Sequence, residues 1–156
     1  VRSDVDFVLT FEEVLGMFAA MGVDKEIIPM DEAQPLQQSS ADARMFAVSG
    51  GVAQAVVNAI HKTNPDLEVK VAKATGLKEC RQLLMMAKAG KYDGYLLEGM
   101  ACPGGCIAGA GTLQPVESSR KNVDKFAEEA DFACALDTEY KDYLPVIEET
   151  GKNYNQ

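Results

Sequence analysis

The sequence predicts an α/β fold, in which a parallel sheet of about four strands has helices on both faces and is followed by a C-terminal helical tail. Short apolar runs alternate along the chain with segments whose apolar residues recur at helical spacing. Turns that contain glycine or proline separate these segments. The chain has 156 residues, the length of one ordinary domain. Strand–helix alternation of this kind is typical of a parallel sheet that helices cover on both sides.

The first elements are a strand and a helix. Val5–Leu9 is expected to be a short buried strand. A helix should follow, because Thr10 and Glu13 form a capping-box pattern and Gly22 suits a helix end. Residues 23–44 are polar and rich in turn formers, which predicts a long surface loop with room for one helical turn.

The next expected elements are a buried segment and a helix. Met45–Val48 is expected to be buried, and Ser49-Gly50-Gly51 opens a helix that should end near Lys62. The apolar face of this helix is expected to consist of Val52, Val56, Ala59 and Ile60.

The sheet continues with two strands around a helix. Residues 67–72 and 94–97 are expected to be strands, and the second one leads into the cysteine-containing loop. The helix between them should start at Thr75-Gly76 and end at Gly90, with Leu77, Leu84 and Met85 facing inward. After Glu117 we expect one helix with an apolar face and a shorter one around residues 140–149. The apolar face of the first consists of Val123, Phe126, Ala127 and Ala130.

Composition excludes several classes of function. A formal charge of −9 leaves no basic stripe for a nucleic acid. No apolar stretch approaches the roughly 20 residues of a membrane span. The start at Val1 is neither a signal peptide nor an initiator methionine, and we interpret the chain as a piece of a larger one. Four unevenly spaced cysteines favour a reduced, cytoplasmic setting, with Cys80 and Cys134 as packed thiols.

Cys102 and Cys106 are the candidate metal ligands. They lie four positions apart in Cys102-Pro103-Gly104-Gly105-Cys106, a tight turn whose glycines let backbone N–H groups approach an anionic partner. Thiolates select zinc, copper(I) or iron–sulfur clusters. Two thiols are too few for a closed site, which normally takes four protein ligands.

Four other residues or segments are candidates for a chemical role. Met100 could line a metal cofactor or pack in the core. Ser49-Gly50-Gly51 suits an anion at a helix start, but it matches neither the phosphate-binding lysine loop nor the dinucleotide glycine pattern. His61 is expected to be solvated, which argues against a hydrolase function for this chain. Glu98 could relay protons or anchor backbone N–H groups.

Residues 100–106, with the glycine-rich stretch and Gln114-Pro115 behind them, closely resemble the third cluster-binding signature of di-iron (FeFe, iron-only) hydrogenases. That signature reads Met-Ala-Cys-x-x-Gly-Cys-x-x-Gly-Gly-Gly-Gln-Pro. Two upstream segments, Asp6–Glu13 and Phe46–Val52, resemble the family's strand and helix after its second signature and its Phe-Gly-Ala-Thr-Gly-Gly-Val segment. The likeness implies that residues 1–115 are the C-terminal lobe of a hydrogenase-like catalytic domain and residues 116–156 a helical tail.

The resemblance also implies a cofactor and its ligands. Cys102 would bind a 4Fe–4S cluster, and Cys106 would bind it and bridge to a di-iron subsite, which together form the H-cluster. Phe46, Ala47 and Met100 would pack against that subsite. The parent protein would be an iron-only hydrogenase (hydrogen:acceptor oxidoreductase) of an anaerobe, which reversibly reduces protons to hydrogen with an electron carrier such as ferredoxin.

The sequence departs from the family pattern in ways that limit what this chain can bind and catalyse by itself. Ala47 and Ala110 replace glycines, and Thr112-Leu113 intervene before Gln114, which indicates a divergent subgroup. The first signature (Thr-Ser-Cys-x-Pro) and the second (Met-Pro-Cys-x-x-Lys) do not occur in this sequence. These would supply the other two cluster ligands, the proton-relay cysteine and the lysine that holds the cofactor.

We therefore expect no catalytic residue in this chain, a site that is empty when the chain is alone, and no activity of the isolated chain. The expected partner is the N-terminal half of the same parent protein. Two alternatives stay open. One is a non-catalytic hydrogenase-like iron–sulfur protein, either a sensor or a cluster assembly factor, since cytosolic assembly factors share a very similar third signature. The other is a binding module whose cysteine turn holds no metal.

Overall fold

Two parallel strands form the sheet in the part of the chain that the structure describes. In the computed structural model, which describes residues 5–23 and 39–143, β1 (Lys70–Thr75) pairs along its length with β2 (Tyr95–Met100). The strands come later in the chain than the expected ranges 67–72 and 94–97, by about three residues for β1. Because β2 runs through Met100, it delivers the chain directly to the cysteine loop.

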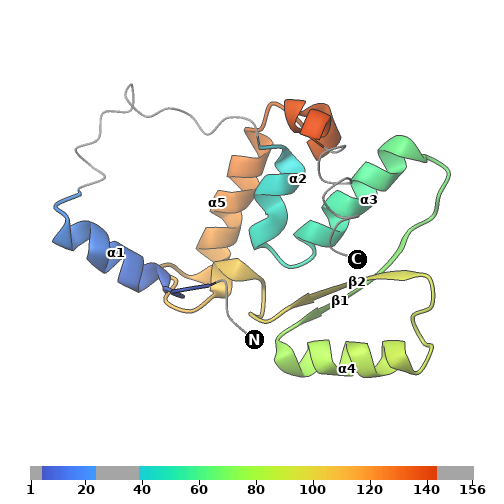
Figure 1. Cartoon of the computed structure of the whole chain (residues 1–156), viewed down its shortest axis with the longest axis horizontal. Helices are drawn as coiled ribbons and strands as arrows, with labels where there is room; N and C mark the ends of the chain where they lie inside the picture. Colours follow the sequence, from blue (N-terminus) through green and yellow to red (C-terminus); the bar gives the residue numbers. More distant parts are fainter. Residues whose placement is uncertain (1–4, 24–38, 144–156) are drawn as a thin grey trace.

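One helix covers each face of this sheet. Helix α4 (Leu77–Lys88) connects the two strands, and α3 (Gly51–Thr63) lies on the opposite face (Figure 1). Neighbouring residues of a strand point to opposite faces. In β2, the Glu98 side chain reaches the start of α3, whereas the Cys80 side chain of α4 lies against Gly99. The predicted α/β class with helices on both faces of a parallel sheet is therefore confirmed.

The predicted number of strands is wrong for the described part of the chain, which holds two rather than about four. Val5–Leu9 forms no strand, and the side chains of Phe7 and Val8 are 84% and 88% exposed. A strand requires a neighbouring strand in a sheet, and the strand pairing among the described residues is that of β1 with β2. Met45–Ala47 is a 3-10 helix, η1, although the next residue, Val48, is buried as expected.

The helix predicted after Thr10 is present as α1 (Phe11–Ala20). The Glu13 N–H donates to the Thr10 hydroxyl, and the Thr10 N–H donates to the Glu13 carboxylate, which completes the capping box. Gly22 follows the helix with φ of +69°, a conformation that suits glycine after a helix end. In the described structure none of the residues of α1 is buried.

The predicted inward face of α4 is wrong. Leu77, Leu84 and Met85 are 74%, 62% and 62% exposed, whereas Leu83 is buried and Cys80 is half-buried against the strands. The exposed three fall on one stripe of the helix, and only the stripe that carries Cys80 and Leu83 meets the sheet. A similar shift occurs in α3, where Gly51, Ala53 and Val57 are the buried residues and Val56 is 39% exposed.

Short helices and α5 complete the described chain. Part of the polar segment 23–44 forms the single turn α2 (Ala41–Arg44), but its residues 24–38 lie outside the described structure. The expected helix at 140–149 begins as a 3-10 helix, η4 (Glu139–Tyr143), and its remainder also lies outside the described residues. Two further elements, α5 (Val116–Glu128) and the 3-10 helix η3 (Ala135–Asp137), lie between the cysteine loop and η4.

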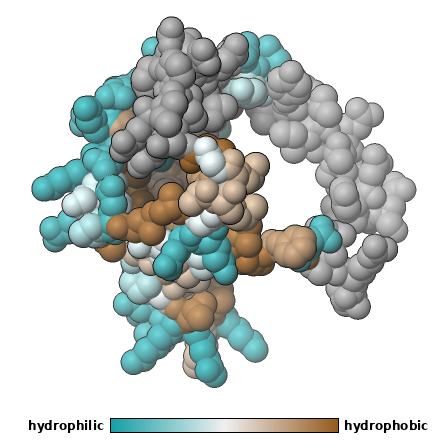
Figure 2. Space-filling view, turned by 90° about the vertical axis from the view of Figure 1, so that its left-hand side faces the viewer, coloured by the Kyte–Doolittle hydropathy of each residue, from teal (hydrophilic) through white to brown (hydrophobic). Residues whose placement is uncertain are grey.

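Apolar side chains remain exposed on the face from which α1 projects. Figure 2 shows them gathered near the middle of that face, with hydrophilic side chains around them. Residues 5–23 contribute strongly, since Phe7, Phe11 and Met21 are each more than half exposed. No helix among the described residues is both long and apolar enough to cross a membrane.

Candidate functional site

The two candidate ligands lie on one loop directly after β2. Cys102 is half-buried at a bend, and Cys106 is exposed at the start of the 3-10 helix η2 (Cys106–Ala108). Both thiols are free, as are those of Cys80 and Cys134. The loop therefore presents two unpaired soft donors within one turn of the chain.

Glycine gives this loop its shape. Gly104 and Gly105 have φ values of +91° and +103°, which side chains of L-residues rarely adopt. The Gly105 N–H closes the turn by donating to the Cys102 carbonyl oxygen over 2.9 Å. A Cβ atom at Gly105 would lie 2.5 Å from the carbonyl oxygen of Ala47. The absence of a side chain is thus what lets the loop pack against η1.

The loop is docked onto the segment that follows η1. The Ser49 N–H donates to the Gly104 carbonyl oxygen over 3.0 Å, next to the buried Val48. Ala47 and the cysteine loop, which are far apart in sequence, are therefore held together by backbone contacts. Since backbone groups make these contacts, they fix the path of the loop rather than the rotamers of its thiols.

Glu98 occupies the anion position at the start of α3. Its side chain is buried, and its two carboxylate oxygens accept hydrogen bonds from the N–H groups of Gly50 (2.7 Å) and Ala53 (2.9 Å). The first N–H groups of a helix lack partners within the helix and attract negative charge. Of the two interpretations offered for Glu98, the structure favours the anchor of backbone N–H groups. The anion expected at Ser49-Gly50-Gly51 is thus the protein's own carboxylate.

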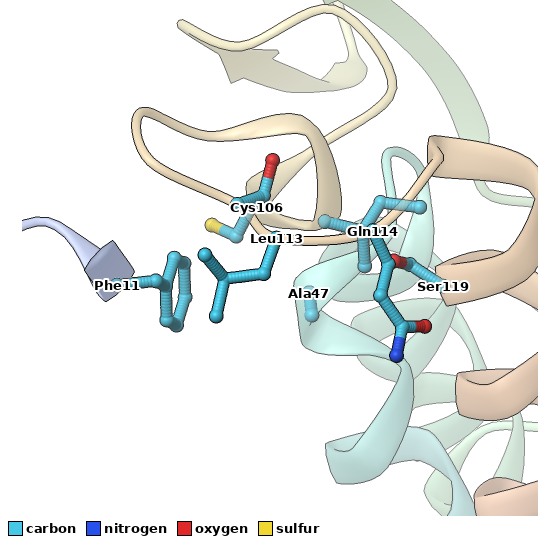
Figure 3. A pocket seen from close by; sticks show the side chains of 8 residues that line it. Phe11, Ala47, Cys106, Leu113, Gln114 and Ser119 are labelled. Atoms are coloured by element: carbon cyan, nitrogen blue, oxygen red, sulfur yellow. The ribbon is translucent and has the colours of Figure 1, made fainter. Parts of the chain in front are cut away.

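An apolar cavity of about 300 Å³ lies beside Cys106 (Figure 3). In Figure 3, Phe11 and Leu113 lie close to the Cys106 thiol, and Ala47 and Gln114 line another part of the wall. The described residues that line this cavity are Phe11, Ala47, Cys106, Ile107, Thr112, Leu113, Gln114 and Ser119. The Cys106 sulfur therefore borders a space that is mostly apolar.

The structure brings together some of the predicted site residues. Ala47 and Cys106 share the cavity wall, but Phe46, Met100 and Cys102 are not among the residues lining it. Phe46 is 47% exposed, and Met100 ends β2 with its carbonyl oxygen accepting from the Gly76 N–H over 2.7 Å. The residues that sequence reasoning missed include Phe11 and Leu113. Leu113 could have been found, because it is a large apolar residue inserted into a glycine-rich run.

The donor set fits one side of an iron–sulfur site. Thiolates are the usual ligands of iron–sulfur clusters, which take four of them. No group of three or more His, Cys, Asp or Glu side chains within residues 5–23 and 39–143 is placed to hold a metal ion. His61 is exposed, with its Nε2 atom 3.1 Å from the Leu67 carbonyl oxygen. In the described part of the chain, the cysteine loop carries two thiols, which is half the number of thiolates that such a cluster takes.

Residues 1–110 match the family model described as "iron only hydrogenase large subunit, C-terminal domain". The chain is 32% identical over 140 residues to the periplasmic [Fe] hydrogenase large subunit of Nitratidesulfovibrio vulgaris (strain Hildenborough), covering 72% of this chain and 33% of that protein. It is 30% identical over 135 residues to the NADP-reducing hydrogenase subunit HndD of Solidesulfovibrio fructosivorans, covering 69% of this chain and 23% of that protein. The chain therefore spans a third or less of the length of these relatives.

Proposed function

The chain belongs to the family of iron-only hydrogenase large subunits, whose C-terminal domain its first 110 residues match, and from this premise we propose that it forms one side of a cluster-binding site in a hydrogenase. The observation that carries the proposal is the pair of free thiols on the glycine turn after β2. The parent protein would be an oxidoreductase that reversibly reduces protons to hydrogen.

Cys102 and Cys106 would hold a 4Fe–4S cluster, with Cys106 also facing a di-iron subsite. Cys106 is the suitable residue for that second contact, because its thiol is exposed and borders the apolar cavity, whereas Cys102 is half-buried. Ala47 lines the same cavity, Met100 ends the strand that leads into the loop, and Phe46 belongs to η1, against which the loop packs. When bound, such a cofactor stores electrons and provides the place where protons are reduced.

The chain's own contribution is to hold the ligands and to give one of them an apolar neighbourhood. Backbone hydrogen bonds fix the path of the cysteine loop, and the cavity wall beside the exposed Cys106 is mostly apolar. An apolar surrounding strengthens electrostatic interactions at a charged group. We assign no acid or base of this chain to proton transfer, because Glu98 is engaged by two backbone N–H groups and His61 is at the surface.

The other half of the ligand set would come from the N-terminal part of the parent protein, and an electron carrier such as ferredoxin would deliver electrons. The isolated chain would then be inactive. We also expect a cytoplasmic location, on the basis of the free cysteines.

A second candidate is a hydrogenase-like iron–sulfur protein without catalysis, such as a sensor or a cluster assembly factor. The observation that favours it is the cavity wall itself, which contains Leu113, one of the two residues that intervene before Gln114, and Ala47, which stands where the family has a glycine. A proton-relay cysteine and a cofactor-holding lysine in the parent protein would favour the hydrogenase.

Anaerobic reconstitution with iron and sulfide tests which thiols bind. We expect the full chain to develop a weak, labile iron–sulfur absorption, and either Cys102→Ser or Cys106→Ser to remove most of it, because each variant leaves a single thiol on the loop. Cys80→Ser and Cys134→Ser are matched controls, since these free thiols lie on α4 and before η3. If the control variants lost the absorption as the loop variants do, the assignment of the ligands would be wrong.

A further inference from the structure

We propose that residues 116–143, which lie beyond the family match at 1–110, are a brace that positions the cysteine loop, and that Arg44 is the positioning residue through which the brace acts. The brace comprises α5, η3, η4 and the turns between them. It does not supply a ligand to the loop. Its contacts instead determine where η1 and the loop docked on η1 are held.

The start of α2 is bound to the brace by backbone hydrogen bonds. The Ala41 N–H donates to the Phe132 carbonyl oxygen over 2.7 Å, and the Asp42 N–H donates to the Ala133 carbonyl oxygen over 3.1 Å. The first N–H groups of a helix have no partner within the helix. The brace therefore completes α2 at its N-terminal end, where Ser40, which is 1% exposed, caps the helix.

The end of α2 is bound to the brace by Arg44. Its Nη1 atom donates to the Phe126 carbonyl oxygen over 2.6 Å, and its guanidinium carbon lies 4.1 Å from the centre of the Phe126 ring. Its Nε atom donates to the carbonyl and hydroxyl oxygens of Ser39 at 3.2 and 3.1 Å. A planar cation that stacks on a ring while it donates in its own plane is a geometry that lysine does not reproduce.

These contacts lead directly to the cysteine loop. Helix α2 continues without a break into η1, and the residues after η1 hold the loop through the bond from the Ser49 N–H to the Gly104 carbonyl oxygen. Helix α5 itself also contacts η1 and η2. A salt bridge between Lys62 and Asp137 ties the brace to α3 as well. Loss of the Arg44 contacts should therefore loosen η1 and, with it, the docked loop.

The purpose of the brace rests on the proposed function, in which the two ligands of this chain must be held in place to meet ligands from the N-terminal part of the parent protein. The existence of the brace does not depend on that function. The brace itself can be measured on the full chain without metal. The Ser49 N–H is a direct reporter, since its hydrogen bond joins η1 to the loop. The Gly76 N–H, which donates to the Met100 carbonyl oxygen in the strand–helix–strand unit, reports on general stability.

The experiment is amide hydrogen exchange by NMR on the full chain and its Arg44→Ala variant. We expect exchange of the Ser49 N–H to become about tenfold faster, the change expected when a hydrogen bond of a charged group is lost, while exchange of the Gly76 N–H stays unchanged. Arg44→Lys should show most of the same acceleration of exchange at the Ser49 N–H. It serves as the second variant should Arg44→Ala fail to fold. Lys125→Ala is the matched control, because the exposed Lys125 pairs with Glu129 at the end of α5, and it should change neither amide.

Unchanged exchange at Ser49 in both Arg44 variants would overturn the proposal. Equal acceleration at Ser49 and Gly76 would overturn it too, because Arg44 would then only stabilise the whole fold. Neither result would affect the cysteine dependence of the iron–sulfur absorption. Conversely, failure of the reconstitution would leave the exchange result standing, so the two proposals fail independently.

Discussion

Gly105→Ala is expected to lower the free energy of unfolding by about 2–5 kcal/mol. The added Cβ would lie 2.5 Å from the Ala47 carbonyl oxygen and 2.7 Å from the Ser49 nitrogen, both backbone atoms that cannot rotate away. Overpacking of this kind costs about 1–3 kcal/mol. The φ of +103° adds about 1–2 kcal/mol for a residue with a side chain. Urea denaturation monitored by circular dichroism measures the loss.

Gly104→Ala is the matched control for this variant. Gly104 also has a positive φ, +91°, but an added Cβ would be 3.6 Å from Val116 Cγ1, an ordinary contact distance. Only the conformational cost of about 1–2 kcal/mol remains. If the two variants were equally destabilised, the close packing of the cysteine loop against η1 would not be a feature of the folded protein.

Glu98→Ala is expected to destabilise the protein by about 3–6 kcal/mol. The substitution removes both acceptors of the Gly50 and Ala53 N–H groups and leaves the start of α3 without a partner in a buried position. Hydrogen bonds to a charged group contribute about 1.5–3 kcal/mol each. The same urea denaturation provides the measurement, and amide exchange at Ala53 locates the effect at the helix start.

Two further variants separate the causes of this loss. Glu98→Gln retains one acceptor oxygen, so we expect about half of the destabilisation. Glu117→Ala removes an exposed carboxylate from the first turn of α5, which should cost under about 1 kcal/mol. A loss for Glu98→Ala no larger than that for Glu117→Ala would contradict the anchoring role of Glu98.

The elements that sequence predicted well are those determined by neighbours in the chain. The capping box of Thr10 and Glu13 gave the start of α1, and glycines marked the ends of α1 and α4. The strand expected at Val5–Leu9 failed for the opposite reason, because a strand is determined by its hydrogen-bonded partner and not by its own residues. The inward face of α4 failed because the helix has apolar residues on more than one stripe, and packing alone selects Leu83.

The candidate site likewise has residues that the sequence identifies and residues that it does not. The two thiols and the glycine turn follow from a local motif, whereas Ala47 follows from the resemblance of Phe46–Val52 to a segment of the family. The structure places Ala47 and Cys106 on one cavity wall. Arg44 and Phe126 could not be identified, because their contact joins segments 82 residues apart that share no motif. Contacts of this kind follow from tertiary packing, which a single sequence does not display.

The central proposal for this chain is that it supplies half of a cluster's ligands. The most direct measurement is iron and sulfide per chain after anaerobic reconstitution and gel filtration, with the mass of the iron-containing species determined by native mass spectrometry. We predict a monomer that retains at most a labile, substoichiometric amount of iron, because two thiols cannot close the site. A stable 4Fe–4S cluster in the monomeric chain would contradict the account.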